Sequence, residues 1–344
     1  WPLIAIPCFE LESFRKSSDH GDLLNAYMRY AGRIFHRPLR EKSVAAQRKR
    51  SSSEAPRSSI PDRATVPEII EICRVMSTCP LEERSVSEIA SLLHRLARLL
   101  PESSQPSAEL DDQAVELLEI LCSSVAKSMR LLEPWELASM IWAQGRILRA
   151  TDLATSHHHL LMEDSGAEVA HRLQRWKSSG APFIPFEARQ LSNIVWAFGA
   201  SHIPSVELIS ALLPVLLLSL PLFTSQEISN TMWAFGRLRR DDTSLFRLAA
   251  QELTQRDLHS LPAQHVVNVA WAFAVTRQSN YSFLSNLHGL VAKQSRALTE
   301  QDIGNLAFAF ERTGMDSARF LTAAMRLPQS SRLQPQSLCM LLWA

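Results

Sequence analysis

The residues best suited to bind a ligand are asparagines that recur beside a repeated Trp-Ala-Phe sequence. Residues 191–199 read LSNIVWAFG, and an asparagine stands three residues before the tryptophan. Its amide can bond a neighbouring turn within the fold or bind an extended ligand at the surface. We favour the structural role, because a buried asparagine must be satisfied. The asparagines are Asn193, Asn230, Asn268 and Asn305.

Arginines form a second periodic feature, a few residues after each Trp-Ala-Phe copy. Stacked repeats would align them along one edge, which suits a phosphate backbone. Cations also complement the dipole at the C-terminal end of a helix, and this alternative stays open. The arginines are Arg146, Arg149, Arg237, Arg239, Arg240, Arg277 and Arg312.

Catalytic and metal-binding patterns are not found in the sequence. There is no phosphate-binding glycine loop, no nucleophile elbow and no HExxH zinc motif. Three adjacent histidines, residues 157–159, point about 100° apart on a helix and cannot converge on one ion, so we interpret them as a solvated loop. We therefore expect no metal, no cofactor and no enzyme activity.

Composition narrows the class of protein further. The chain has 344 residues and a formal net charge of +1, so it is not a uniformly basic nucleic-acid binder. Its five cysteines are an odd number without a CxxC pair, which suits a reducing compartment and argues against a disulfide scaffold or a zinc ribbon. Ten glycines are few for a nucleotide-binding α/β fold.

The elements that position these residues repeat along the chain. The aromatic anchors Trp196, Trp233, Trp271, Phe308 and Trp343 follow one another at intervals of 37, 38, 37 and 35 residues. A fixed period of this size is the signature of a repeat architecture. Each copy has apolar residues at helical spacing, and a second helix is predicted after it. The sequence predicts an all-α fold, an α-solenoid of stacked two-helix repeats of about 37 residues. The second helices are expected at residues 205–219, 242–253, 281–294 and 316–325.

The anchors are interpreted as structural residues of the repeat. A helix that is apolar on two sides must be covered on two sides, and neighbouring repeats provide that cover. The small residues that follow the tryptophans, Ala197, Ala234 and Ala272, are expected to let helices approach closely. An earlier copy adds Trp142 to the anchors, and the structural role is assigned to Trp142, Trp196, Trp233, Trp271 and Phe308.

Four segments follow from these patterns. Residues 1–65 are predicted to hold a helix and a basic, Ser-rich arm; residues 66–150 are degenerate helical repeats; residues 151–186 are an insertion; and residues 187–344 are regular repeats with a truncated last copy. The arm contains Arg48, Lys49 and Arg50, and either lies along phosphates or is a solvated linker. The uncovered final helix leads us to expect a segment of a longer or processed protein.

The most apolar stretch, residues 208–223, is short and interrupted by proline, whereas a membrane span needs about 20 apolar residues. We expect a buried helix kinked at Pro214 and no membrane partner.

The motif L/I-x-N-x-x-W-A-F-G/A resembles the octotricopeptide and heptatricopeptide repeats of organellar RNA-associated proteins, which often precede a RAP domain. It is most similar to heptatricopeptide-like proteins of apicomplexan mitochondria. Residues 187–344 carry the resemblance well, with Phe308 in place of Trp, and Gln144 replaces Phe in an earlier copy. No RAP domain is visible, so its activity is not carried over. The resemblance implies an RNA-binding α-solenoid of the mitochondrial matrix.

The leading hypothesis is a protein that binds rRNA as a component or assembly factor of the mitochondrial ribosome, with ribosomal or other ribonucleoprotein proteins as partners. The alternatives are a transcript processing or stability factor and a peptide-binding scaffold of armadillo type. In armadillo repeats the asparagine follows the tryptophan, whereas here it precedes it. A continuous positive stripe would favour RNA, and a neutral or acidic groove lined by asparagine would favour a peptide. In the RNA-binding hypothesis, unstacked bases would contact polar residues near the N-terminal ends of the first helices, such as Gln190, Gln226, Gln264 and Gln301.

Overall fold

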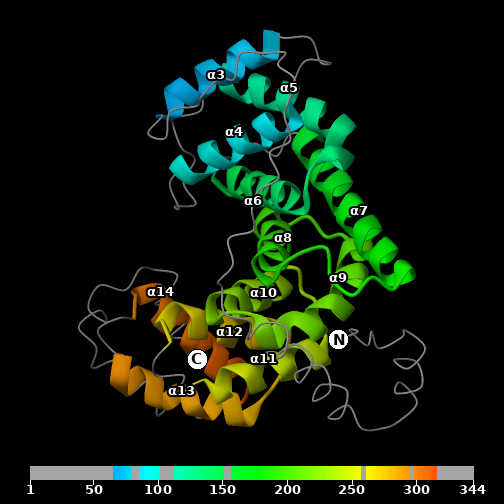
Figure 1. Ribbon diagram of the computed structural model, residues 1–344. Helices are drawn as coiled ribbons and strands as arrows, with labels where there is room; N and C mark the ends of the chain where they lie inside the picture. The colour runs from blue at the N-terminus through cyan, green and yellow to red at the C-terminus, as the bar shows by residue number, and fades with distance from the viewer. Residues whose placement is uncertain are drawn as a thin grey trace, which may run out of the picture. The chain divides into compact units, whose positions relative to one another are not determined.

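The structure is a computed structural model that describes residues 65–78, 85–100, 112–150, 156–256, 261–294 and 298–315. Within these ranges the chain forms twelve α-helices, α3 to α14, and no strand (Figure 1). The predicted all-α class is therefore confirmed for this part of the chain.

The helices are stacked in two rows, because each helix packs against the next but one along the sequence. The first row consists of α4 (Val86–Leu99), α6 (Pro134–Ala150), α8 (Ala188–Ser201), α10 (Ser225–Arg237), α12 (Ala263–Val275) and α14 (Glu300–Arg312). The second row consists of α3 (Val66–Thr78), α5 (Asp112–Ser128), α7 (Ser156–Ser179), α9 (Val206–Ser219), α11 (Thr243–Gln255) and α13 (Tyr281–Gln294). Each first-row helix except α14 also contacts the second-row helix that follows it. The result is a stacked helical arrangement with its core between the rows.

The deepest aromatic residues of the first row are phenylalanines, not the tryptophans. The phenylalanine two residues after the anchor is fully buried in four successive first-row helices, whereas the anchors themselves are only half-buried. One side of each helix is thus covered by the second row, and the anchor side is covered only in part. The buried phenylalanines are Phe198, Phe235, Phe273 and Phe310.

Small residues set the spacing within the first row, as the sequence predicts. A Cβ atom added to Gly199 would lie 2.7 Å from the Cα atom of Ala234, and one added to Gly145 would lie 2.6 Å from the Cα atom of Ala197. These distances leave no room for a side chain between α6, α8 and α10. Gly236 and Ala272 repeat the contact between α10 and α12 at 3.0 Å.

The helix ends follow local sequence rules. Thr224 with Glu227 and Thr299 with Asp302 form the capping boxes predicted for α10 and α14. The C-terminal ends of α10, α12 and α14 share a Schellman motif; in α10, Arg240 N donates to Phe235 O and Arg239 N to Gly236 O. The motif requires a residue in the left-handed region, six positions after the anchor, before the chain turns into the second row.

The second-row helices α9, α11 and α13 occupy the predicted ranges. The expected helix at 316–325 and the copy near residue 338 lie outside the described residues, as do the N-terminal helix and basic arm of residues 1–64. Pro214 lies inside α9 and lacks the N–H group that would bond the carbonyl oxygen of Ser210. Ser210 is exposed, so water can satisfy that oxygen. No described helix combines the length and the apolar character that a bilayer crossing requires.

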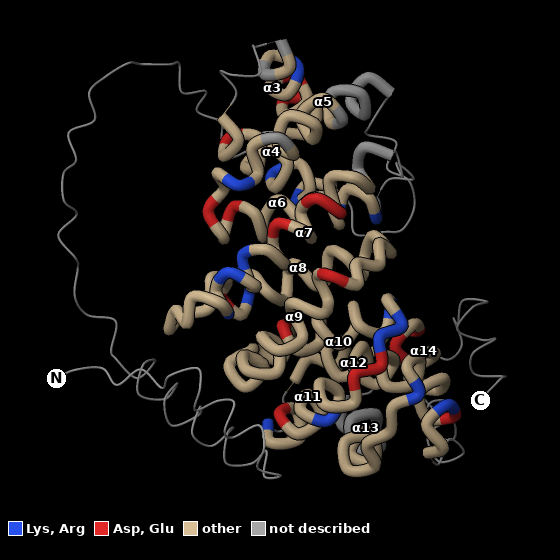
Figure 2. The backbone as a smooth tube through the Cα atoms, turned by 90° about the vertical axis from the view of Figure 1, so that its right-hand side faces the viewer, with Lys and Arg blue, Asp and Glu red and all other residues tan. Residues whose placement is uncertain are grey.

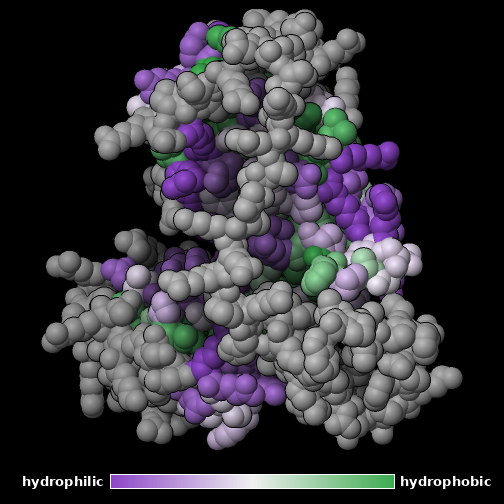
Figure 3. All heavy atoms as spheres, viewed as in Figure 1, coloured by the Kyte–Doolittle hydropathy of each residue, from purple (hydrophilic) through white to green (hydrophobic). Residues whose placement is uncertain are grey.

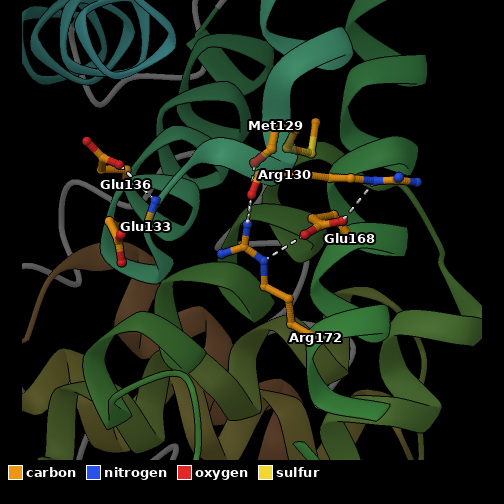
Figure 4. Close-up of polar contacts among 6 residues, drawn as sticks. All are labelled: Met129, Arg130, Glu133, Glu136, Glu168 and Arg172. Atoms are coloured by element: carbon orange, nitrogen blue, oxygen red, sulfur yellow. Dashed lines mark hydrogen bonds and ion pairs between the residues drawn. The ribbon is translucent and has the colours of Figure 1, made fainter. Parts of the chain in front are cut away.

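The segment expected as an insertion contains α7, which packs between α5 and α9 as a long member of the second row. Figure 4 shows how it is fixed to the preceding turn η2 (Met129–Leu131). Arg172 forms an ion pair with Glu168 at 2.7 Å and donates to the carbonyl oxygens of Met129 and Arg130 at 3.4 Å. The three histidines begin α7 and do not form a loop, which corrects the prediction, and the side chain of His159 is exposed.

Candidate nucleic-acid interface

The half-covered side of the first row forms one surface, which we call the anchor face. It consists of the anchors and the residues seven before, three before and four after each of them. These spacings place all four positions on one side of a helix. In α10 they are Gln226, Asn230, Trp233 and Arg237, and each is exposed or half-buried. The same pattern of exposure recurs in α12 and α14, so the anchor face continues along the row.

Aromatic rings run across this face from helix to helix. The ring centroids are 5.2 Å apart between His94 and Trp142, 6.2 Å between Trp142 and Trp196, and 6.3 Å between Trp196 and Trp233. The anchors therefore support one another by ring contact while keeping part of each indole accessible. Such a row offers π-surface on which unstacked bases can pack.

The four asparagines are half-buried, and none forms a side-chain hydrogen bond to a described residue. Between α8 and α10 the residue before the asparagine joins the helices: Ser192 Oγ donates to Glu227 O at the start of α10. The amides of Asn193, Asn230, Asn268 and Asn305 stay available to a ligand on the anchor face.

Arg146 serves the fold as well as the surface. Its Nε atom donates to Ala97 O at 2.6 Å and its Nη2 atom donates to Leu100 O at 2.7 Å, so it caps the C-terminal end of α4. Its guanidinium carbon also lies 5.8 Å from the ring centre of Trp142. The arginine periodicity thus includes at least one residue whose donors are bound within the chain.

Arg149 and Arg237 converge on one tryptophan. Their guanidinium carbons lie 5.6 Å and 5.5 Å from the ring centre of Trp233, although Arg149 belongs to α6 and Trp233 to α10. Arg237 also donates from Nη2 to His202 Nε2. Burial, and then the charge of Arg237, lowers the pKa of His202, which fits an imidazole that accepts this bond in its neutral form.

The remaining predicted arginines lie at the turns between the rows. Arg239 and Arg277 are exposed and have φ angles of 51° and 56°, and Arg312 is an exposed residue at the end of α14. Arg240 is half-buried and is followed by Asp241 and Asp242, which offset its charge and that of Arg239. In Figure 2 blue segments alternate with tan and red ones along the row, so the arginines do not form an unbroken positive band. Arg48, Lys49 and Arg50 lie outside the described residues.

Three anchor-face residues are missing from the sequence-based set. Trp135 stands seven residues before Trp142 and is 59% exposed. Arg189 holds the same position in α8, and His94 replaces the anchor in α4. Burial, followed by the charges of Arg98 and Arg189, lowers the pKa of His94. Extending the seven-residue spacing backwards from each anchor would have found Trp135 and Arg189.

Three observations concern the remaining described residues. They contain no group of three potential metal ligands. In Figure 3 the hydrophobic residues that are visible between the undescribed, grey ones lie next to hydrophilic residues. Cys73 is buried, and this burial raises the pKa of its thiol to about 11, so it is a poor nucleophile.

Searches against family models and against curated proteins found no match to this chain.

Proposed function

We propose that the chain is an RNA-binding helical-repeat protein that holds RNA along the anchor face. The observation that carries this proposal is the combination of accessible indoles, amides without a partner in the described chain and converging guanidiniums on one side of the first row. Indoles stack on bases, amides bond base edges, and guanidiniums bind phosphates. The arrangement offers all three kinds of contact.

The proposed architecture is an α-solenoid of two-helix repeats of about 37 residues. It is supported by the equal placement of the anchors within α8, α10, α12 and α14, the first three of which are each followed by one second-row helix. An RNA strand laid across the row would meet an asparagine and an aromatic anchor at the same positions of each of these four helices.

The proposed setting is the mitochondrial matrix, with rRNA and the mitochondrial ribosome as the first candidate target. This setting rests on the resemblance of the Trp-Ala-Phe repeat to organellar RNA-associated proteins. A factor for processing or stability of one transcript is the alternative within the same class.

A peptide-binding scaffold is the alternative from another class. The same unbonded amides favour it, since asparagine side chains can pair with the backbone of an extended peptide. The acidic residues beside Arg239 and Arg240 also reduce the positive charge that RNA would meet. The two guanidiniums at Trp233 favour RNA, because they supply positive charge that a peptide backbone does not need.

The direct test is binding of a fluorescent oligouridylate of about 20 nucleotides, long enough to span several stacking positions. We expect the combined variant Asn230→Ala and Asn268→Ala to weaken binding about tenfold, because hydrogen-bond donors and acceptors facing the bases are lost. The matched control is Asn286→Ala, which removes an exposed asparagine from the second-row helix α13. Equal affinity for wild type and the double variant would refute a role of the amides in RNA binding.

The biological target is tested by purification from gently lysed mitochondria, followed by sizing and RNA sequencing. Co-sedimentation with ribosomal particles and rRNA would support the ribosomal role. A small complex with a single transcript would support a processing or stability factor. Recovery of proteins without RNA would favour the peptide scaffold.

A further inference from the structure

One place on the anchor face brings together side chains from helices that are not neighbours. Arg149, in the last turn of α6, reaches Trp233 on α10, although α8 packs between these two helices. Arg237 approaches the same indole from its own helix, one turn further along. A helix dipole explains why an arginine stands at the end of α6, but not why its guanidinium extends across α8.

The residue that α8 places at this level makes the crossing possible. Four residues after its anchor, α6 has Arg146 and α10 has Arg237, whereas α8 has Ala200, which is 5% exposed. A methyl group in the middle helix leaves the surface above it to the longer side chains on either side. Because α8 has alanine here, no long side chain of α8 stands at this position between Arg149 and the indole of Trp233.

The two guanidiniums repel each other without compensation from an acid. Neither Arg149 nor Arg237 forms an ion pair with a described residue. Burial, and then the charge of Arg149, lowers the pKa of Arg237. The indole attracts both cations, but it carries no net charge to neutralise them.

One donor of Arg237 is also left without an acceptor. Its Nε atom is buried and unbonded, while its Nη2 atom donates to His202. A buried N–H that lacks a partner costs free energy, and a shift of the side chain that brings this N–H to an acceptor would recover that cost. An acceptor that is also anionic would at the same time relieve the repulsion between the guanidiniums.

We propose that Arg149, Arg237 and Trp233 form a phosphate seat: the two guanidinium forks hold one phosphoryl group of RNA beside the face of the indole. The tetrahedral oxygens of a phosphate can accept from two forks at once, which is the recognition for which arginine is best suited. The proposal rests on the proposed RNA binding and adds the residues that fix one phosphate. The phosphoryl group belongs either to an internal phosphodiester or to a 5′-terminal monophosphate.

The test compares wild type with Arg149→Gln, Arg237→Gln and the double variant. Each single change should weaken binding of the oligouridylate about tenfold and reduce the slope of log K against log salt by about one. The double variant should bind little worse than either single variant, because both arginines share one phosphate. Arg175→Gln and Arg247→Gln, which remove exposed arginines from the second row, are matched controls that should change neither quantity.

Two oligonucleotides separate the sources of the phosphate. If wild type prefers a 5′-monophosphate over a 5′-hydroxyl and both variants lose this preference, the seat binds the RNA terminus. If the variants lose the same amount of affinity for both oligonucleotides, the seat binds an internal phosphodiester. Unchanged affinity and salt slope in both variants, with RNA still bound by wild type, would overturn the phosphate seat and leave the proposed function intact.

A second readout does not depend on RNA. Inorganic pyrophosphate should raise the melting temperature of wild type and not that of Arg149→Gln. Without the anion, Arg149→Gln should melt at the same or a higher temperature, because a repulsion is removed, whereas a purely structural arginine would lower it. If wild type binds no RNA but its melting temperature rises with pyrophosphate, the proposed function is refuted and the phosphate seat is supported. No response in wild type, together with normal RNA binding by the variants, refutes the seat.

Discussion

Arginines in the left-handed region at two turns give a prediction in which stability and binding change in opposite directions. The position six residues after the anchor is Arg239 with φ 51° and Arg277 with φ 56°, but Gly314 with φ 70°. A left-handed conformation costs a residue with a Cβ atom about 1–2 kcal/mol, whereas glycine adopts it freely. The exposed arginines therefore occupy positions where the Schellman motif favours glycine.

Replacing each arginine by glycine should raise the free energy of unfolding by about 0.5–1 kcal/mol, because relief of the conformational cost of about 1–2 kcal/mol exceeds the about 0.5–1 kcal/mol of extra backbone entropy that glycine loses on folding. For a unit of this size that corresponds to a rise in melting temperature of about 1–4 °C for each change. The converse variant, Gly314→Arg, should lower the free energy of unfolding by a similar amount. No atom lies within 4 Å of a Cβ atom added at this position, so only the backbone conformation opposes the substitution.

The assay is urea and thermal denaturation of Arg239→Gly, Arg277→Gly and the combined variant, followed by RNA binding at several salt concentrations. If the arginines contact phosphates, the more stable variants bind RNA more weakly and with a shallower salt slope. Unchanged or lower stability in the combined variant would refute the reasoning, because it would mean that the arginine side chains make stabilising contacts larger than the backbone cost.

Three further predictions concern packing, the anchors and pH. Gly199→Val should destabilise the protein by about 1–3 kcal/mol, because its Cβ atom would meet Ala234; a urea midpoint equal to that of wild type would contradict the close contact. Phe235→Ala should cost about 3–5 kcal/mol in urea denaturation, whereas Trp233→Ala, on the half-covered side, should cost less and should mainly weaken RNA binding; equal losses of stability would contradict the placement of the tryptophan. Burial lowers the pKa of His94, His202 and His265, so the unfolded chain binds protons more readily than the folded one, and stability should be complete above about pH 6.5 and decrease below it. Urea midpoints measured at about pH 7.5 and pH 5.5 check this, and His94→Asn combined with His265→Asn should flatten the decrease; an increase in stability at the lower pH would contradict the sign.

The secondary structure could be predicted because its signals are local. The capping boxes at Thr224 and Thr299 and the apolar spacing within each copy lie within one or two turns of helix. The close approach of the first-row helices was also predictable, since alanine and glycine recur at fixed distances from the anchor. These features depend on residue type and spacing, which are fully visible in a sequence.

The orientation of the helices could not be predicted in the same way. In LSNIVWAFG both Trp196 and Phe198 are large and apolar, and they point to different sides of α8. Periodicity shows that the two sides differ but not which side the second row covers. Phe198 is the buried one, and Trp196 lies on the half-covered side, where it contacts two other indoles.

The polar residues show why the distinction matters for function. A stacked repeat needs some polar side chains to join neighbouring helices, and Ser192 and Arg146 meet this need by bonding to backbone carbonyls of the adjacent units. The fold therefore does not require the amides of the asparagines or the convergence of Arg149 and Arg237, which lowers stability through repulsion and an unbonded donor. The asparagines recur on one face without a partner in the described chain, and the arginine pair stands there against its own repulsion; both observations support the proposal that a ligand binds this face.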